Sequence, residues 1–119
     1  MNRCRTRHFA GTRENSRHKG PGAEPELRAA LDALRAQAAA VGRPAHVVAM
    51  QWALQKPGVV CVIPGARTVA QLEANLGAAL LPPLPGEVVA ALDAGSDALK
   101  AKMGAFIDSY ESDEGQRSF

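Results

Sequence analysis

One stretch near the middle of the sequence combines residue types that could bind an anion. Gly65 and Arg67 directly follow an apolar run, and Thr68 is placed as the N-cap of a helix. Helix N-termini carry partial positive charge, glycine lets a ligand approach the backbone, and arginine can grip a phosphate with two parallel hydrogen bonds. Gln71 and Asn75 lie four residues apart, on one helical face. The spacing therefore indicates a phosphate site, with candidate residues Gly65, Ala66, Arg67, Gln71 and Asn75.

The same stretch also fits a plain strand-to-helix turn, in which the arginine and the two amides are solvated, and spacing alone slightly favours that interpretation.

Other residues of catalytic type are scattered along the chain. The only tyrosine, Tyr110, lies in an acidic stretch, and His8 and His18 lie in a basic one. His46 falls in the first turn of a predicted helix, where we expect a structural role, and Cys61 should behave as a small hydrophobe. We predict no metal site.

The elements that position the candidate site follow from apolar spacing and from prolines and glycines. Pro25 suits a first helical turn, Gly42 suits a helix end, and Leu27, Leu31 and Leu34 recur at helical spacing between them. The same reasoning predicts helices over residues 25–41, 44–55, 69–80, 85–94 and 97–106.

Residues 59–63, Val-Val-Cys-Val-Ile, predict a strand that is apolar on both faces, as in the middle of a parallel sheet. The chain offers no second strand to satisfy its backbone donors and acceptors. Either this strand does not form, or its partners lie on another polypeptide. We therefore expect the isolated chain to be mostly α-helical with one buried-type strand at about residues 59–63.

The two ends of the sequence differ from its middle. Residues 1–23 carry a net positive charge, since the first 20 residues contain six basic side chains against one acidic, a net charge of +5. With one aromatic residue and no zinc-ligand spacing, we favour a disordered basic leader over a nucleic-acid-binding arm. Residues 108–119 predict an acidic flexible tail, which leaves residues 24–107 as the structured region.

Length and composition exclude several classes of protein. A chain of 119 residues is too short for an eight-fold α/β barrel, which needs ~250 residues. No run reaches the ~18 apolar residues of a membrane span, and no apolar stretch follows the N-terminal arginines, so we predict neither a membrane helix nor a secretory signal. Cys4 and Cys61 lie far apart, which favours a reducing compartment. We expect a cytoplasmic protein.

Three motifs in order resemble the C-terminal part of the aldo-keto reductases: Ala49–Leu54, Val59–Arg67 and Gln71–Leu76. The resemblance covers about residues 25–95, whereas residues 1–20 show no convincing match. It implies the fold class α/β, with this chain as a C-terminal fragment of a (β/α)8 TIM barrel: seventh helix, strand eight, helix eight and an extra C-terminal helix. Enzymes of that family transfer hydride between NADP(H) and a carbonyl or alcohol.

The resemblance also implies roles for the candidate site. Gly65–Arg67 correspond to the turn that contacts the adenosine 2′-phosphate of NADP(H), and Gln71 aligns with an Arg or Gln one turn into the following helix. Asn75 aligns with the Asn that meets the adenine. Many members have Glu directly before that Asn, where this chain has Ala74.

The family's chemistry uses an Asp, a Tyr, a Lys and a His near the early barrel strands, and no segment here matches them. Our first hypothesis is a C-terminal, NADP(H)-binding part of an aldo-keto reductase, inactive without its catalytic portion. The alternative is a small helical interaction module, which pairs with a separately encoded remainder of the barrel or with a full-length relative.

Overall fold

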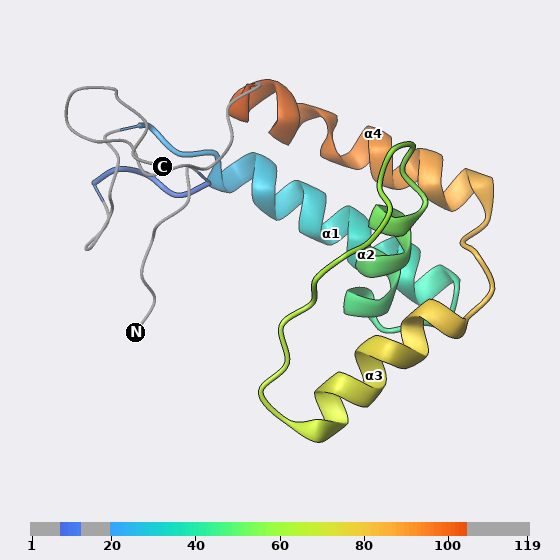
Figure 1. Ribbon diagram of the computed structural model, residues 1–119. Helices are drawn as coiled ribbons and strands as arrows, with labels where there is room; N and C mark the ends of the chain where they lie inside the picture. Colours follow the sequence, from blue (N-terminus) through green and yellow to red (C-terminus); the bar gives the residue numbers. More distant parts are fainter. Residues whose placement is uncertain (1–7, 13–19, 105–119) are drawn as a thin grey trace. The chain divides into compact units, whose positions relative to one another are not determined.

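The computed structural model describes residues 8–12 and 20–104. These contain four α-helices, α1 (Glu24–Ala40), α2 (Ala45–Leu54), α3 (Val69–Leu80) and α4 (Gly86–Met103) (Figure 1). The expected tail, the end of the expected last helix and most of the expected leader lie outside the described residues. The chain divides into two compact units, of which the unit Leu31–Gly95 contains every candidate site residue.

The helix ends follow local sequence signals. Gly42, with φ of 65°, adopts the left-handed conformation in the turn after α1, and Gly58, with φ of 82°, does so in the turn after α2. Thr68 caps α3, because its side chain accepts a hydrogen bond from the Gln71 N–H. The first three helices differ from the expected ranges by at most one residue at either end.

A single helix, α4, stands where we expected two helices over residues 85–94 and 97–106. The two expected ranges leave a break at residues 95 and 96, but Gly95 lies inside the helix. A Cβ on Gly95 would lie only 2.7 Å from the Ala33 Cβ of α1. The glycine therefore permits close packing of α4 against α1 and does not end the helix.

The expected strand at residues 59–63 is absent: the described residues contain no strand at all. The segment belongs to the long connection between α2 and α3 (Figure 1). Val60 and Ile63 are 93% and 94% exposed, and Cys61 is exposed too rather than interior. The physical reason is that residues 8–12 and 20–104 offer no partner strand, since a strand forms only where a neighbour satisfies its backbone groups.

A small apolar core holds the unit Leu31–Gly95 together. It joins α1, α2, α4 and the connection before α4 through the buried residues Ala38, Val48, Leu84, Val88 and Leu92. Trp52 packs against this core. By contrast, α3 buries only Ala78 and leaves its larger apolar side chains exposed: Leu72, Leu76 and Leu80.

A polar clamp, made by Arg43, Gln51 and Gln55, ties α2 to the connection after α3. Gln51 is 4% exposed; its side chain accepts from Arg43 Nη1 (2.7 Å) and donates to the Pro82 carbonyl (3.0 Å). Arg43 Nη1 donates to the same carbonyl at 2.9 Å. Gln55 pairs with the backbone N–H and carbonyl of Leu84 at 2.8 and 3.1 Å. The clamp fixes both ends of the segment that leads from α3 to α4.

A second polar contact joins α2 to α4. Trp52 Nε1 donates to Asp93 Oδ1 at 2.9 Å, and Lys56 Nζ pairs with the same oxygen. Lys56 Nζ also lies 5.0 Å from the centre of the Trp52 ring, within cation–π range. The Lys56 ammonium group is therefore already engaged with Asp93 and the Trp52 ring.

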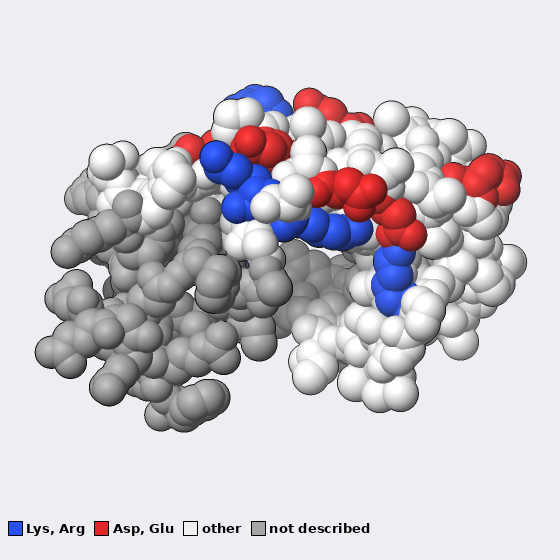
Figure 2. Space-filling model, turned by 90° about the horizontal axis from the view of Figure 1, so that it is seen from above, with Lys and Arg blue, Asp and Glu red and all other residues white. Residues whose placement is uncertain are grey.

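Charges on the described surface are mixed in sign. On the face shown in Figure 2, basic and acidic side chains lie side by side. Arg35 forms an ion pair with Asp32, and Lys100 forms one with Asp97; the partners in each pair lie one helical turn apart. Such exposed pairs add little stability. Within the described residues no helix is long and apolar enough to cross a membrane. The same residues hold no group of three or more His, Cys, Asp or Glu side chains placed to bind a metal ion.

Candidate functional site

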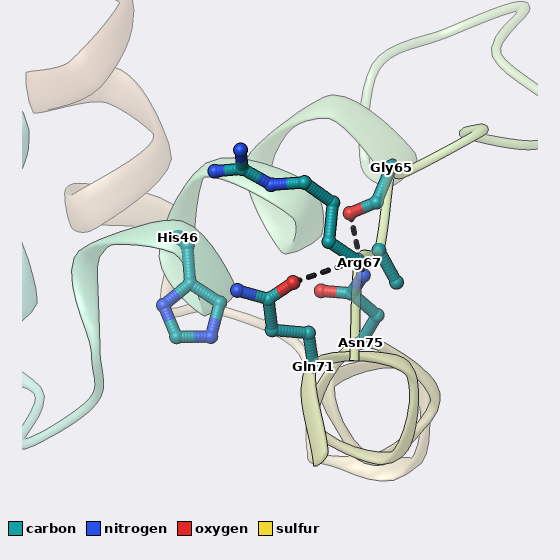
Figure 3. Close-up of a pocket in the computed structure, with 6 residues that line it drawn as sticks. His46, Gly65, Arg67, Gln71 and Asn75 are labelled. Carbon is teal, nitrogen blue, oxygen red and sulfur yellow. Dashed lines mark hydrogen bonds between the residues drawn. The ribbon is translucent and has the colours of Figure 1, made fainter. Parts of the chain in front are cut away.

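The predicted site residues line one cavity of about 550 Å³ beside the start of α3 (Figure 3). Three come from the turn before α3 and two from its first two turns. A sixth lining residue, His46, comes from the first turn of α2. The complete lining is His46, Gly65, Ala66, Arg67, Gln71 and Asn75.

The turn before α3 is held by reciprocal hydrogen bonds. Thr68 Oγ1 accepts from the Gln71 N–H (3.2 Å), and Gln71 Oε1 accepts from the Arg67 N–H (2.8 Å). The pattern is a variant of the capping box, shifted by one residue on the return bond. Two backbone donors of the turn are thereby satisfied internally. Gln71 keeps its Nε2 group as a donor for a ligand, while its oxygen belongs to the turn.

Asn75 ties the turn back to α3 one further turn along. Its Nδ2 donates to the Gly65 carbonyl at 3.3 Å (Figure 3). The Asn75 side-chain oxygen accepts no hydrogen bond from the described part of the chain, so it remains an acceptor. Gly65 itself has open space, since a Cβ built there would meet nothing within 4 Å.

Arg67 gives the cavity its positive charge. Its guanidinium is exposed and makes no hydrogen bond or ion pair with the described residues. In Figure 3 its side chain extends from the turn to the side of the cavity that His46 lines. Arg43 differs, because its donors are used by the polar clamp. No lining residue is acidic. The cavity therefore suits an anion with several oxygen atoms.

His46 is the site residue that sequence reasoning missed, because we expected a structural role for it. Its side chain is exposed and hydrogen-bonds to none of the residues that the structure describes. A topological signal could have found it. In successive β/α units, helices begin at the same end, where the strands finish, so the first turns of α2 and α3 come close if the chain folds as barrel units.

A smaller, apolar cavity of about 340 Å³ adjoins the site on the side of residues 60–64. Side chains of α2 and α3 line it together with that segment, among them Met50, Leu54, Leu72 and Leu76. Asn75 lines both cavities. Apart from Asn75 and the Cys61 thiol, this second lining offers no polar side chain, so the groups that can recognise an anion are confined to the larger cavity.

A comparison with protein families gives one match. The model of the aldo/keto reductase family matches residues 4–97, which include every residue of the larger cavity. The match begins at residue 4, within the segment where we had seen no resemblance. No curated protein and no solved structure matches the chain significantly. The family match covers most of the sequence, and the chain belongs to the aldo/keto reductase family.

Proposed function

We propose that this chain holds the adenosine 2′-phosphate and adenine end of NADP(H) in an aldo-keto reductase barrel. The family consists of oxidoreductases that generally use NAD(P)H, which supports a nicotinamide cofactor. The observation that carries the proposal is the cavity itself. It is lined by Arg67, which has no ion-pair partner among the described residues, by the Gln71 Nε2 donor and by Gly65, which has open space beside it. No acidic side chain lines it.

Each lining group has a role in this proposal. The Arg67 guanidinium binds the 2′-phosphate with parallel hydrogen bonds, and Gln71 Nε2 donates to the same group. The remaining free N–H groups at the start of α3 add the favourable field of a helix N-terminus. Asn75 accepts a hydrogen bond from the adenine amino group, and Gly65 leaves room for the ribose. The bound cofactor supplies or accepts hydride at its nicotinamide, the opposite end of the molecule.

The rest of the unit then takes its place in a barrel. We propose α2 and α3 as the seventh and eighth barrel helices and α4 as the extra C-terminal helix. Residues 59–63 become strand eight once neighbouring strands satisfy their backbone groups. The catalytic Asp, Tyr, Lys and His of the family come from a part of the barrel that this sequence does not contain, so the chain alone is inactive.

The substitution Arg67→Ala tests the phosphate assignment. Hydrogen bonds to charged groups contribute about 1.5–3 kcal/mol, so NADPH should bind about 10- to 100-fold more weakly, while the affinity for NADH changes by less than about twofold. Isothermal titration calorimetry with each cofactor gives both affinities. Arg35→Ala is the matched control, since Arg35 is an exposed arginine of α1 paired with Asp32. Equal weakening of NADPH and NADH by Arg67→Ala would refute the phosphate assignment.

One observation favours a second candidate function. Large exposed apolar side chains concentrate between residues 59 and 81, including Val60, Ile63, Leu76 and Leu80. We propose that these side chains pair with a separately encoded remainder of the barrel or with a full-length relative. Sedimentation velocity at micromolar concentration tests this, alone and with such a partner added. A compact monomer that forms no complex with the added partner would contradict it.

A further inference from the structure

We infer that His46 is a second phosphate-recognising residue of the cavity, which together with Arg67 selects 2′-phosphorylated over unphosphorylated adenosine nucleotides. This inference rests on the proposed function. It concerns a residue that lies outside the motif around the turn before α3. It follows from the position of His46 in the lining of the cavity and from the hydrogen bonds and ion pairs that other basic side chains already make.

His46 and Arg67 reach the cavity from different elements. Arg67 and Gln71 come from the turn and first turn of α3, whereas His46 comes from the first turn of α2. All three line the same cavity (Figure 3). A phosphate bound by the Arg67 guanidinium on that side lies between two separate elements. An imidazole always carries at least one N–H donor, and that of His46 has no acceptor among the described residues.

The basic groups that flank α2 are already engaged. Arg43 donates to Gln51 and to the Pro82 carbonyl. Lys56 pairs with Asp93. Neither lines the cavity, and no carboxylate lines it. Among the lining residues, His46 and Arg67 both have side-chain N–H donors that no described residue accepts. A phosphate in this cavity can therefore accept hydrogen bonds from both side chains.

The element that carries His46 is firmly anchored. Val48 of α2 is fully buried in the core, and Gln51 is held by the polar clamp. Pro44, the N-cap of α2, provides no side-chain hydrogen bond to the first turn. Polar donors at the start of α2 are thus left for a partner outside the helix. The core and the polar clamp therefore hold His46 in a fixed position. Movement of α2 cannot compensate for loss of the imidazole.

The test compares two nucleotides that differ only by the 2′-phosphate: adenosine 2′,5′-bisphosphate and 5′-AMP. Each is titrated into the full chain and followed by amide NMR shifts. His46→Ala should weaken the bisphosphate about tenfold and leave 5′-AMP within about twofold. His46→Gln keeps an N–H donor and should retain most of the affinity. Arg35→Ala, which removes a positive charge away from the cavity, should change neither affinity.

The outcomes separate this inference from the proposed function. If Arg67→Ala selectively weakens the bisphosphate but His46→Ala does not, His46 has no part in recognition and only the inference fails. Equal weakening of both nucleotides by His46→Ala assigns a merely structural role and overturns it as well. If the unmodified chain binds both nucleotides equally, or binds neither, the proposed phosphate site fails together with the inference.

Discussion

Gln71 serves two purposes at the start of α3. Its oxygen accepts the Arg67 N–H and fixes the turn, and its Nε2 group remains available to a ligand. A single side chain therefore couples the shape of the turn to recognition. This explains why an amide fits the position better than an arginine would in this chain, because a guanidinium cannot accept the turn's hydrogen bond.

The substitution Gln71→Glu separates these two purposes. A carboxylate still accepts the Arg67 N–H, and a negative charge near a helix N-terminus is favourable, so α3 should stay folded. The donor is lost and a like charge faces the phosphate. NADPH affinity should fall more than about tenfold, with a smaller change for NADH and an unchanged circular dichroism spectrum. Unchanged NADPH affinity would place the phosphate elsewhere. Gln37→Glu on α1 is the matched control.

The residues of the candidate site could be selected from the sequence because their signals are local. Thr68 and Gln71 are three residues apart, the spacing of a cap, and Arg67 directly precedes them. His46 could not be selected in this way. Its position depends on how α2 packs beside α3, which no spacing within either helix records. The direction in which the Gln71 oxygen turns is likewise a property of the folded turn.

At the level of elements, a glycine ends a helix only where the tertiary structure has a turn at that position. Gly42 ends α1 with a positive φ, as its position after the apolar period indicates. Gly95 is also a glycine, but it lies inside α4 and packs closely against Ala33 of α1. The sequence alone does not distinguish these two uses of glycine, because the second depends on a neighbouring helix.

Substitutions at two glycines test the close approach of α4 to α1. Alanine in a helix is about 1 kcal/mol more favourable than glycine. Gly77→Ala on α3, where a Cβ meets nothing within 4 Å, should therefore stabilise the chain by up to about that amount. Gly95→Ala should instead destabilise it by about 1–2 kcal/mol, because overpacking outweighs helix propensity. Urea unfolding, followed by the fluorescence of the single tryptophan, measures both. A stabilising Gly95→Ala would contradict the packing described here.

Residues 59–63 show the limit of prediction from one chain. Their composition is that of a buried central strand, and Pro57-Gly58 and Pro64-Gly65 stand on either side of the apolar run. A strand, however, is a property of a pair. Without a neighbour, Val60 and Ile63 stay exposed and no ladder forms.

At the scale of the whole molecule, the family assignment explains features that look unfavourable in isolation. The family match over residues 4–97 includes the segment 59–63 and the exposed face of α3. An isolated domain rarely leaves several large apolar side chains together on its surface. In a barrel, the same side chains meet neighbouring strands and helices, so their exposure is consistent with a surface made to be covered.

The central claim is that the cavity beside α3 recognises the 2′-phosphate of NADP(H). Amide NMR titration of the unmodified chain with NADPH and with NADH tests it most directly. We predict shifts confined to residues 65–75 and the first turn of α2, with NADPH bound about tenfold or more tightly than NADH. Equal affinities for the two cofactors, or shifts centred elsewhere in the chain, would contradict it.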